Sequence, residues 1–315
     1  MLIYLPRLEN GPFVDTAVNH LETLARVDRV GEHELTDDPT VADVILFPQC
    51  HMVDWRLQAI RKHHLTRSFW EKVMIYDERD RTWPSFPGVY VSMPKRRFDC
   101  RFQRAWSYMA VPEAGDIQDD ADLLFSFVGS PSSPCRTPLF ALHHAESVVE
   151  EVQDFMFWDE SSPAYSQRRS RYQEILSRSR FVLCPRGRGT STFRLYEALA
   201  AGRVPVIISD DWIPPDGPNW DSFSIRWPEG RTEDLVAMLE ERDAEWPAMS
   251  VAAKSAHRAF FDTDVAFHQL INACQRLLES PTWRPATRAG IRRRGSVAVC
   301  ASLPARLRTT MRLVD

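Results

Sequence analysis

The segment that decides the fold runs from residue 180 to residue 208 and reads RFVLCPRGRGTSTFRLYEALAAGRVPVII. Two short and mainly apolar stretches, 180–184 and 204–208, have the length and composition of buried parallel strands. Between them lie a glycine-rich loop and a stretch of helical periodicity, predicted to be a helix over 192–201 that ends before Gly202. A strand, a loop, a helix and a second strand in this order predict one βαβ unit of a parallel sheet.

The same alternation continues on both sides of this unit. Further apolar runs predict strands at 2–6, 44–47, 73–76, 89–91, 123–128 and 223–226. Periodicity and composition predict helices at 14–25, 55–72, 137–153, 166–177, 232–242 and 265–279. The chain is therefore expected to be an α/β protein whose parallel sheets are covered by helices on both faces.

Composition changes around residues 112–122, where the chain is acidic and poor in apolar side chains. We predict a domain boundary there, since 315 residues are enough for two ordinary domains. The predicted organisation is an N-terminal domain over 1–121, a C-terminal domain over 122–283, and a basic tail or return helix over 284–315. Both domains are expected to be Rossmann-like and to face each other across a cleft.

The formal net charge of −4 hides an uneven distribution. Residues 284–315 contain eight arginines and one acidic residue, so the rest of the chain carries a net charge of −11. A body this acidic lacks the broad positive surface of a nucleic-acid-binding protein, and an anionic ligand would need a few well-placed cations. The basic tail leaves open a peripheral contact with a membrane surface.

The six cysteines are far apart, without the paired spacing or the neighbouring histidines of a zinc site. The N-terminus lacks the basic and apolar regions of a signal peptide, and no stretch of about 20 uncharged apolar residues occurs. We therefore expect a cytoplasmic protein with reduced thiols, no transmembrane segment and no bound metal.

The loop between the two central strands has the features of an anion-binding site. It supplies glycines that permit unusual backbone angles, hydroxyls that can cap a helix, and cations: Arg186, Gly187, Arg188, Gly189, Thr190, Ser191 and Thr192. The N-terminus of the following helix presents free N–H groups and the positive end of a dipole, which suits phosphate.

Arg194 and Glu197 lie three residues apart and hence on one face of this helix. Arg194 in the first turn opposes the helix dipole, so its position is favourable when an anion binds there. One turn later, Glu197 can accept hydrogen bonds from two hydroxyl groups, as a ribose offers. Alternatively, the two side chains form an ordinary ion pair on a solvated helix. The loop matches neither the NTPase phosphate motif nor the three-glycine dinucleotide fingerprint.

Three stretches resemble the donor-binding core of exostosin-type glycosyltransferases: CPRGRG at 184–189, STFRLYEAL at 191–199 and AGRVPVIISDDWIPP at 201–215. A weaker likeness extends to ADVILFP at 42–48, FSFVGS at 125–130 and WDSFS at 220–224. The resemblance implies the GT-B fold and an inverting glycosyltransferase without an obligatory metal or other cofactor. Its donor would be a nucleotide diphosphate sugar, usually a UDP-sugar, and its acceptor a hydroxyl group on a glycan or a small molecule.

The resemblance also implies roles for individual residues. The C-terminal domain would bind the donor and the N-terminal domain the acceptor. Arg186 and Arg194 would hold the diphosphate, and Glu197 the ribose. Gly129 and Ser130 would form the first glycine turn of the donor domain, with Arg136 as a further phosphate contact.

An inverting transfer needs a general base that takes the proton of the acceptor hydroxyl. Ligands of open parallel sheets bind at the carboxyl ends of the strands, which favours Asp77, Glu78 or Asp80 after strand 73–76, with His51 next. Ion pairing with neighbouring arginines is the alternative role of Asp77 and Asp80. Two other functions stay open: a fucosyltransferase-like enzyme that uses a GDP-sugar, and a non-catalytic protein that binds nucleotide sugars or glycans.

Overall fold

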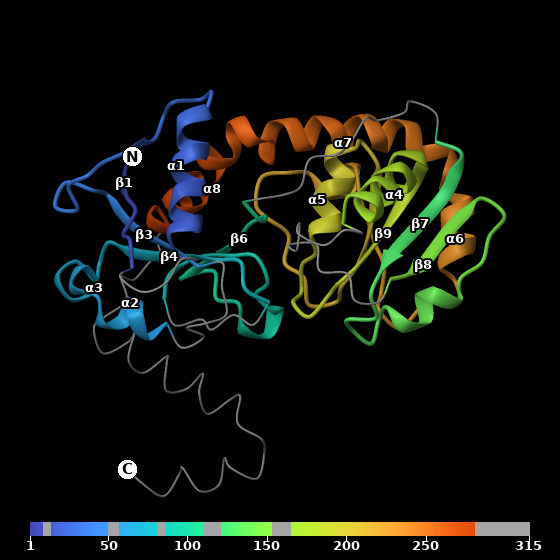
Figure 1. Cartoon of the computed structure of the whole chain (residues 1–315), viewed down its shortest axis with the longest axis horizontal. Helices are drawn as coiled ribbons and strands as arrows, with labels where there is room; N and C mark the ends of the chain where they lie inside the picture. The colour runs from blue at the N-terminus through green and yellow to red at the C-terminus, as the bar shows by residue number, and fades with distance from the viewer. Residues whose placement is uncertain (9–13, 50–56, 81–85, 110–120, 153–164, 281–315) are drawn as a thin grey trace, which may run out of the picture. The chain divides into compact units, whose positions relative to one another are not determined.

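The computed structural model describes residues 1–8, 14–49, 57–80, 86–109, 121–152 and 165–280. Its contacts divide the chain into two compact units. Unit 1 comprises Met1–Trp106 together with residues 267–280, and unit 2 comprises Ser107–Ala266. Each unit contains one parallel sheet with helices (Figure 1), so the predicted α/β class with two parallel sheets is confirmed.

The sheet of unit 1 has the strand order β2-β1-β3-β4-β5-β6, and all of its pairs are parallel. The strands are β1 (Leu2–Tyr4), β2 (Glu34–Leu35), β3 (Val44–Gln49), β4 (Val73–Asp77), β5 (Gly88–Tyr90) and β6 (Gln103–Ala105). The helical elements are α1 (Val14–Val27), α2 (Gln58–Lys62), α3 (His64–Ser68) and the 3-10 turn η2 (Lys95–Arg97). Every residue of β4 is buried, as its apolar sequence predicts.

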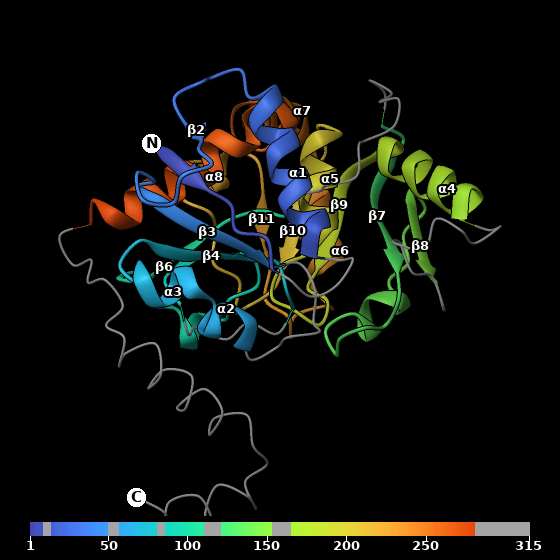
Figure 2. The same ribbon diagram turned by 60° about the vertical axis from the view of Figure 1, so that its left-hand side comes forward.

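The sheet of unit 2 has the strand order β11-β10-β9-β7-β8, again with parallel pairs only (Figure 2). The strands are β7 (Leu123–Gly129), β8 (Ser147–Glu151), β9 (Ser179–Pro185), β10 (Val204–Ile208) and β11 (Ile225–Arg226). The helices are α4 (Tyr165–Arg178), α5 (Phe193–Ala200), α6 (Leu235–Glu241) and α7 (Trp246–Phe260), with 3-10 turns η3 (Thr137–Ala141), η4 (Trp220–Ser222) and η5 (Asp243–Glu245). Helix α8 (Thr263–Leu278) begins in unit 2 and continues in unit 1.

Two predicted helices are wrong. The stretch 137–153 contains η3 and strand β8, because the β-branched pair Val148 and Val149 aligns with β7 and extends the sheet. The stretch 55–72 contains two short helices, because His63 has extended backbone angles and its ring accepts a hydrogen bond from the Leu65 amide. Helix α7 was not predicted.

The two units do not coincide with the predicted domain boundaries. The division falls after Trp106, earlier than residue 121, and the end of α8 groups with unit 1. Asn272 on this helix lies 3.0 Å from the ring of His33, which explains part of that grouping. The predicted tail 284–315 lies outside the described residues. Within the described ranges, no helix has the length and apolar character needed to cross a membrane.

Both sheets have the strand order of a doubly wound fold. The second strand lies on one side of the first strand, and the third and later strands follow on its other side. In unit 2 this switch point lies between β7 and β9. Ligands of such sheets bind outside the carboxyl ends of the strands at the switch point. Strand β7 ends at Gly129 and β9 ends at Pro185, so the two loops with predicted donor contacts begin there.

Candidate functional site

The loop of residues 186–192 connects β9 to α5 and is fixed at both of its ends. The Arg186 amide donates to the carbonyl of Ile208 at 3.0 Å, and the Ser209 hydroxyl donates to the carbonyl of Thr190 at 2.8 Å. Both bonds join the loop to the carboxyl end of β10 and the residue after it. The loop therefore has a defined position before any ligand binds.

The glycines near this loop have ordinary backbone angles, and Gly129 lies close to the guanidinium of Arg194. Among the described residues, neither Gly187 nor Gly189 has a positive φ, so the expected unusual backbone angles are absent there. A Cβ atom on Gly129 would lie only 2.8 Å from Nη2 of Arg194. Gly202, by contrast, has a φ of +61° and ends helix α5 as predicted.

Arg194 has hydrogen-bond donors available for a ligand. Its guanidinium lies over the ring of Phe127, 4.9 Å from the centroid, and Nη2 donates to the carbonyl of Val128. Nε and Nη1 are buried and have no hydrogen-bond partner among the described residues, and the same is true of Oγ1 of Thr190. Buried donors without partners are costly, and an anion would satisfy them.

The N-terminus of α5 is also free of a side-chain cap. Thr192 holds the N-cap position with extended angles (φ −148°, ψ 140°), but its hydroxyl makes no capping hydrogen bond. The amides of the first helical turn therefore do not donate to a capping hydroxyl of Thr192, as the sequence had suggested they could. Together with Arg194, they place positive charge at the switch point, where an anion site is expected from the sequence.

Arg136 has a different environment from the one expected of a phosphate ligand. Its Nε donates to the carbonyl of Arg186 at 2.9 Å, Nη2 to that of Pro185 at 3.1 Å, and Nη1 to that of Ser130 at 3.2 Å. All three guanidinium nitrogens therefore donate to backbone carbonyls, one at the end of β9 and one in each of the loops that follow β7 and β9. This buried arginine clamps the loops together.

The two arginines of the loop differ in their environment. Arg186 is paired with Glu229, with 2.8 Å between Nε and the carboxylate, and Glu229 also accepts from the Asp210 amide. An incoming diphosphate would share Arg186 with this carboxylate. Arg188 is exposed. Glu229 follows β11 and was not among the predicted site residues, since a single acidic residue in a loop carries no distinctive pattern.

Glu197 is held by two side chains of helix α4. Its Oε1 lies 3.2 Å from Nη1 of Arg169, and its Oε2 accepts a hydrogen bond of 2.6 Å from the hydroxyl of Tyr172. Arg194 does not pair with Glu197 in the described part of the chain, so the alternative of a solvated ion pair within α5 is not formed. Sequence reasoning missed both α4 residues, although their i,i+3 spacing on a predicted helix was visible.

The candidate bases belong to unit 1 and differ in their surroundings. Asp77 is fully buried and accepts from Nε, Nη2 and the amide of Arg79, at 2.8, 2.7 and 3.0 Å. This arrangement is the ion pair that was the alternative role of Asp77. Glu78 is half-buried and accepts from the Tyr76 hydroxyl, while Asp80 is exposed. The remaining candidate, His51, lies outside the described residues.

One group of side chains in unit 1 has the proximity of metal ligands: Glu32, His33 and His268, whose ligand-capable atoms lie within 4.8 Å of one another. The two imidazoles are stacked, with 5.0 Å between their centroids, and the side chain of Asn272 lies 3.0 Å from Nε2 of His33 and 2.7 Å from Nε2 of His268. Nδ1 of His33 lies 3.3 Å from the amine of Met1. Burial lowers the pKa of His33, which favours the neutral form of this imidazole.

Residues 88–242 match the Exostosin GT47 domain. A probable glycosyltransferase of Arabidopsis thaliana is 32% identical over 113 residues, 35% of this chain and 20% of that protein. The exostosin-1 homolog of Caenorhabditis elegans is 48% identical over 56 residues, 17% of this chain and 15% of that protein. A probable glucuronosyltransferase of Oryza sativa subsp. japonica is 32% identical over 147 residues, 43% of this chain and 33% of that protein.

The matched segments thus span at most a third of these relatives. Among solved structures, Anabaena HepE in complex with UDP is similar over 87% of this chain and 99% of its own, with 9% identity and a TM-score of 0.42. The matched range 88–242 contains the loops after β7 and β9, the clamp of Arg136 and the carboxylate of Glu197 with its partners on α4. Residues 88–242 of this chain therefore match the exostosin GT47 domain, the family that its sequence motifs resemble.

Proposed function

We propose that this chain is a glycosyltransferase that moves a sugar from a nucleotide diphosphate sugar to a hydroxyl group of a glycan or small molecule. The observation that carries the proposal is Arg194, whose buried Nε and Nη1 have no hydrogen-bond partner among the described residues and lie beside a helix N-terminus without a side-chain cap. The exostosin GT47 domain and the glycosyltransferase and glucuronosyltransferase names of similar proteins support the reaction class. A UDP-sugar is the proposed donor, because the family resemblance favours it.

In the proposed reaction the acceptor oxygen attacks the anomeric carbon from the face opposite the diphosphate. The new glycosidic bond forms as the bond to the diphosphate oxygen breaks, so the anomeric configuration inverts. The leaving diphosphate gains negative charge, which Arg194 and the N-terminus of α5 stabilise without the help of a metal. Glu78, Asp80 or His51 takes the proton of the acceptor. Asp77 is not among the proposed bases, since Arg79 occupies its carboxylate.

Isothermal titration with UDP and GDP tests donor binding, and a panel of UDP- and GDP-sugars tests turnover. In Arg194→Met the nucleotide loses charged hydrogen bonds, each worth about 1.5–3 kcal/mol, so binding should weaken at least about tenfold and turnover should fall. Arg171→Gln is the matched control, because Arg171 is an exposed arginine of α4 with surface ion pairs only.

Each result has a defined meaning. Equal nucleotide affinity in Arg194→Met and in the parent would refute the site. Tighter binding of GDP than of UDP would assign a GDP-sugar donor, as in the fucosyltransferase-like alternative. Binding of a nucleotide sugar without any transfer or hydrolysis would favour the non-catalytic binding protein.

A further inference from the structure

Helix α4 contributes two side chains to the environment of Glu197, and neither belongs to the motifs that mark the donor site. Arg169 and Tyr172 are three residues apart on α4 and therefore project from the same side of the helix. Each contacts a different oxygen of the Glu197 carboxylate, at 3.2 and 2.6 Å. The carboxylate is thus fixed in position and in rotation.

This arrangement leaves part of the carboxylate available. A carboxylate can accept about four hydrogen bonds, two on each oxygen. Arg169 uses one position on Oε1 and Tyr172 uses one on Oε2, and no other partner of the Glu197 carboxylate occurs among the described residues. One acceptor position therefore remains on each oxygen, which matches the two adjacent hydroxyl groups of a ribose.

The two partners also offset the burial of the Glu197 carboxylate. Its side chain is only 9% exposed, and a carboxylate in such a place requires a cation or strong donors nearby. Arg169 supplies the charge. Burial and the negative charge of Glu197 raise the pKa of Tyr172 well above its ordinary value, so the phenol stays protonated and donates.

Tyr172 also connects the two halves of the proposed site. Its ring lies under the guanidinium of Arg194, with 5.9 Å between Cζ of Arg194 and the ring centroid. Its hydroxyl meets Glu197 on the next turn of α5. One side chain of α4 therefore contacts both the cation proposed for the diphosphate and the carboxylate proposed for the ribose.

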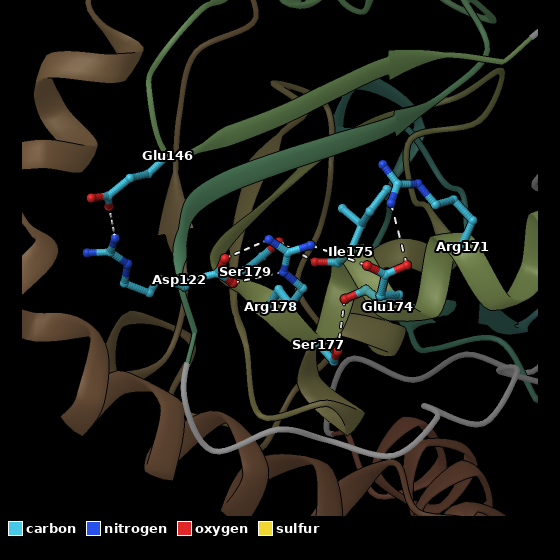
Figure 3. A network of polar contacts seen from close by, with 9 residues as sticks. Asp122, Glu146, Arg171, Glu174, Ile175, Ser177, Arg178 and Ser179 are labelled. Atoms are coloured by element: carbon cyan, nitrogen blue, oxygen red, sulfur yellow. Dashed lines mark hydrogen bonds and ion pairs between the residues drawn. The ribbon is translucent and has the colours of Figure 1, made fainter.

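Helix α4 itself is fixed to the sheet beyond this contact. Figure 3 shows the ion pairs that link Arg171, Glu174 and Arg178 along the helix and join Arg178 to Asp122, next to the start of β7. The two bonds between Arg178 and Asp122 measure 2.9 and 2.6 Å. The hydroxyl of Ser179, directly after the helix, donates to Ser126 of β7 at 2.7 Å. These contacts hold α4 beside β7.

We infer that Tyr172 and Arg169 are positioning residues that orient Glu197 toward the ribose diol, so that the site selects ribonucleoside diphosphates over their 2′-deoxy forms. This inference rests on the proposed function. Neither α4 residue needs to touch the reacting atoms. Their effect is expected in the discrimination between ribose and deoxyribose, a quantity that a merely structural contact would not change.

The test measures the dissociation constants of UDP and 2′-deoxy-UDP for the full chain by isothermal titration. The parent should bind UDP at least about ten times more tightly, because a hydrogen bond from a hydroxyl to a carboxylate is lost in the deoxy form. In Tyr172→Phe, UDP affinity should fall about five- to tenfold, with 2′-deoxy-UDP changed less than about twofold. Arg169→Gln should act in the same direction. Tyr165→Phe and Arg171→Gln are controls on the same helix, and both should behave like the parent.

A double-mutant cycle shows whether Tyr172 acts through Glu197. In a Glu197→Gln background, Tyr172→Phe should cause no further loss of UDP affinity, and an additive loss would overturn the inference. An equal loss for UDP and 2′-deoxy-UDP in Tyr172→Phe, or no loss, would overturn it as well. If the parent binds UDP and 2′-deoxy-UDP equally tightly, the inference is also overturned. A parent that binds neither UDP nor GDP would overturn the proposed function itself, and melting curves identify any variant that is not folded.

Discussion

The buried ion pair between Asp77 and Arg79 has a matched counterpart on the surface of unit 1. In both places an aspartate accepts from the amide, Nε and Nη2 of the arginine two residues later. The Asp77 and Arg79 side chains are 0% exposed, whereas Asp99 and Arg101 are 32% and 59% exposed. The geometry of the three hydrogen bonds is therefore nearly constant, whereas the access of water differs.

Replacing each aspartate with asparagine separates the effect of burial from that of geometry. Asp77→Asn leaves a buried guanidinium without its carboxylate, which costs about 3–5 kcal/mol of unfolding free energy. Asp99→Asn should change stability little, because water and salt already screen that pair. With urea m-values of about 2–3 kcal/mol/M, the Asp77 change should lower the unfolding midpoint by about 1–2.5 M.

Urea unfolding followed by tryptophan fluorescence measures both variants under one set of conditions. The double variant Asp77→Leu/Arg79→Met should be more stable than Asp77→Asn alone, because no buried charge is left. Equal midpoint shifts for Asp77→Asn and Asp99→Asn would refute the reasoning. Loss of sugar transfer in Asp77→Asn under conditions where the variant is fully folded would return Asp77 to the candidate bases.

Three further predictions concern glycines and a histidine. Gly88→Ala should lower the unfolding free energy by at least about 3 kcal/mol, since its Cβ would lie 2.0 Å from the Ile75 carbonyl at a φ of +151°; an unchanged urea midpoint would contradict this. Gly129→Ala should displace Arg194 and weaken UDP binding about tenfold with little change in melting temperature, and unchanged titration curves would count against the site. Burial lowers the pKa of His33 below 6.5, so the unfolded chain takes up this proton first as the pH falls. The protein should therefore lose stability below about pH 6.5, less steeply in His33→Gln; equal slopes in melts from pH 7.5 to pH 5 would show that His33 does not contribute.

Some features of the site were visible in the sequence because they depend on neighbours along the chain. The βαβ unit around residues 180–208 follows from two apolar runs and one helical period, and β10 has the predicted bounds 204–208. The end of α5 at Gly202 follows from a glycine after a periodic stretch. The placement of the loop 186–192 beside a helix N-terminus is a consequence of that local order.

Other features depend on residues that are distant in sequence. Arg136 carries the same charge as Arg194, yet it meets backbone carbonyls about 50 residues away, and this contact has no sequence signal. The short strand β8 was predicted as part of a helix, because its pairing with β7 outweighs the local pattern. The alternatives for Glu197 were likewise undecided until α4 supplied its partners.

The sequence by itself determined the fold class, the parallel sheets and the segment that carries the candidate anion site, because apolar periodicity and turn residues act over a few neighbouring positions. The tertiary structure decided which polar groups are used and which remain free. The charge of Asp77 is paired with that of Arg79 in the protein interior. Nε and Nη1 of Arg194, by contrast, have no hydrogen-bond partner among the described residues and can donate to a ligand. The reason is that the energy of a charge depends on burial and on its partners, and both are fixed only when strands and helices from distant parts of the chain pack together.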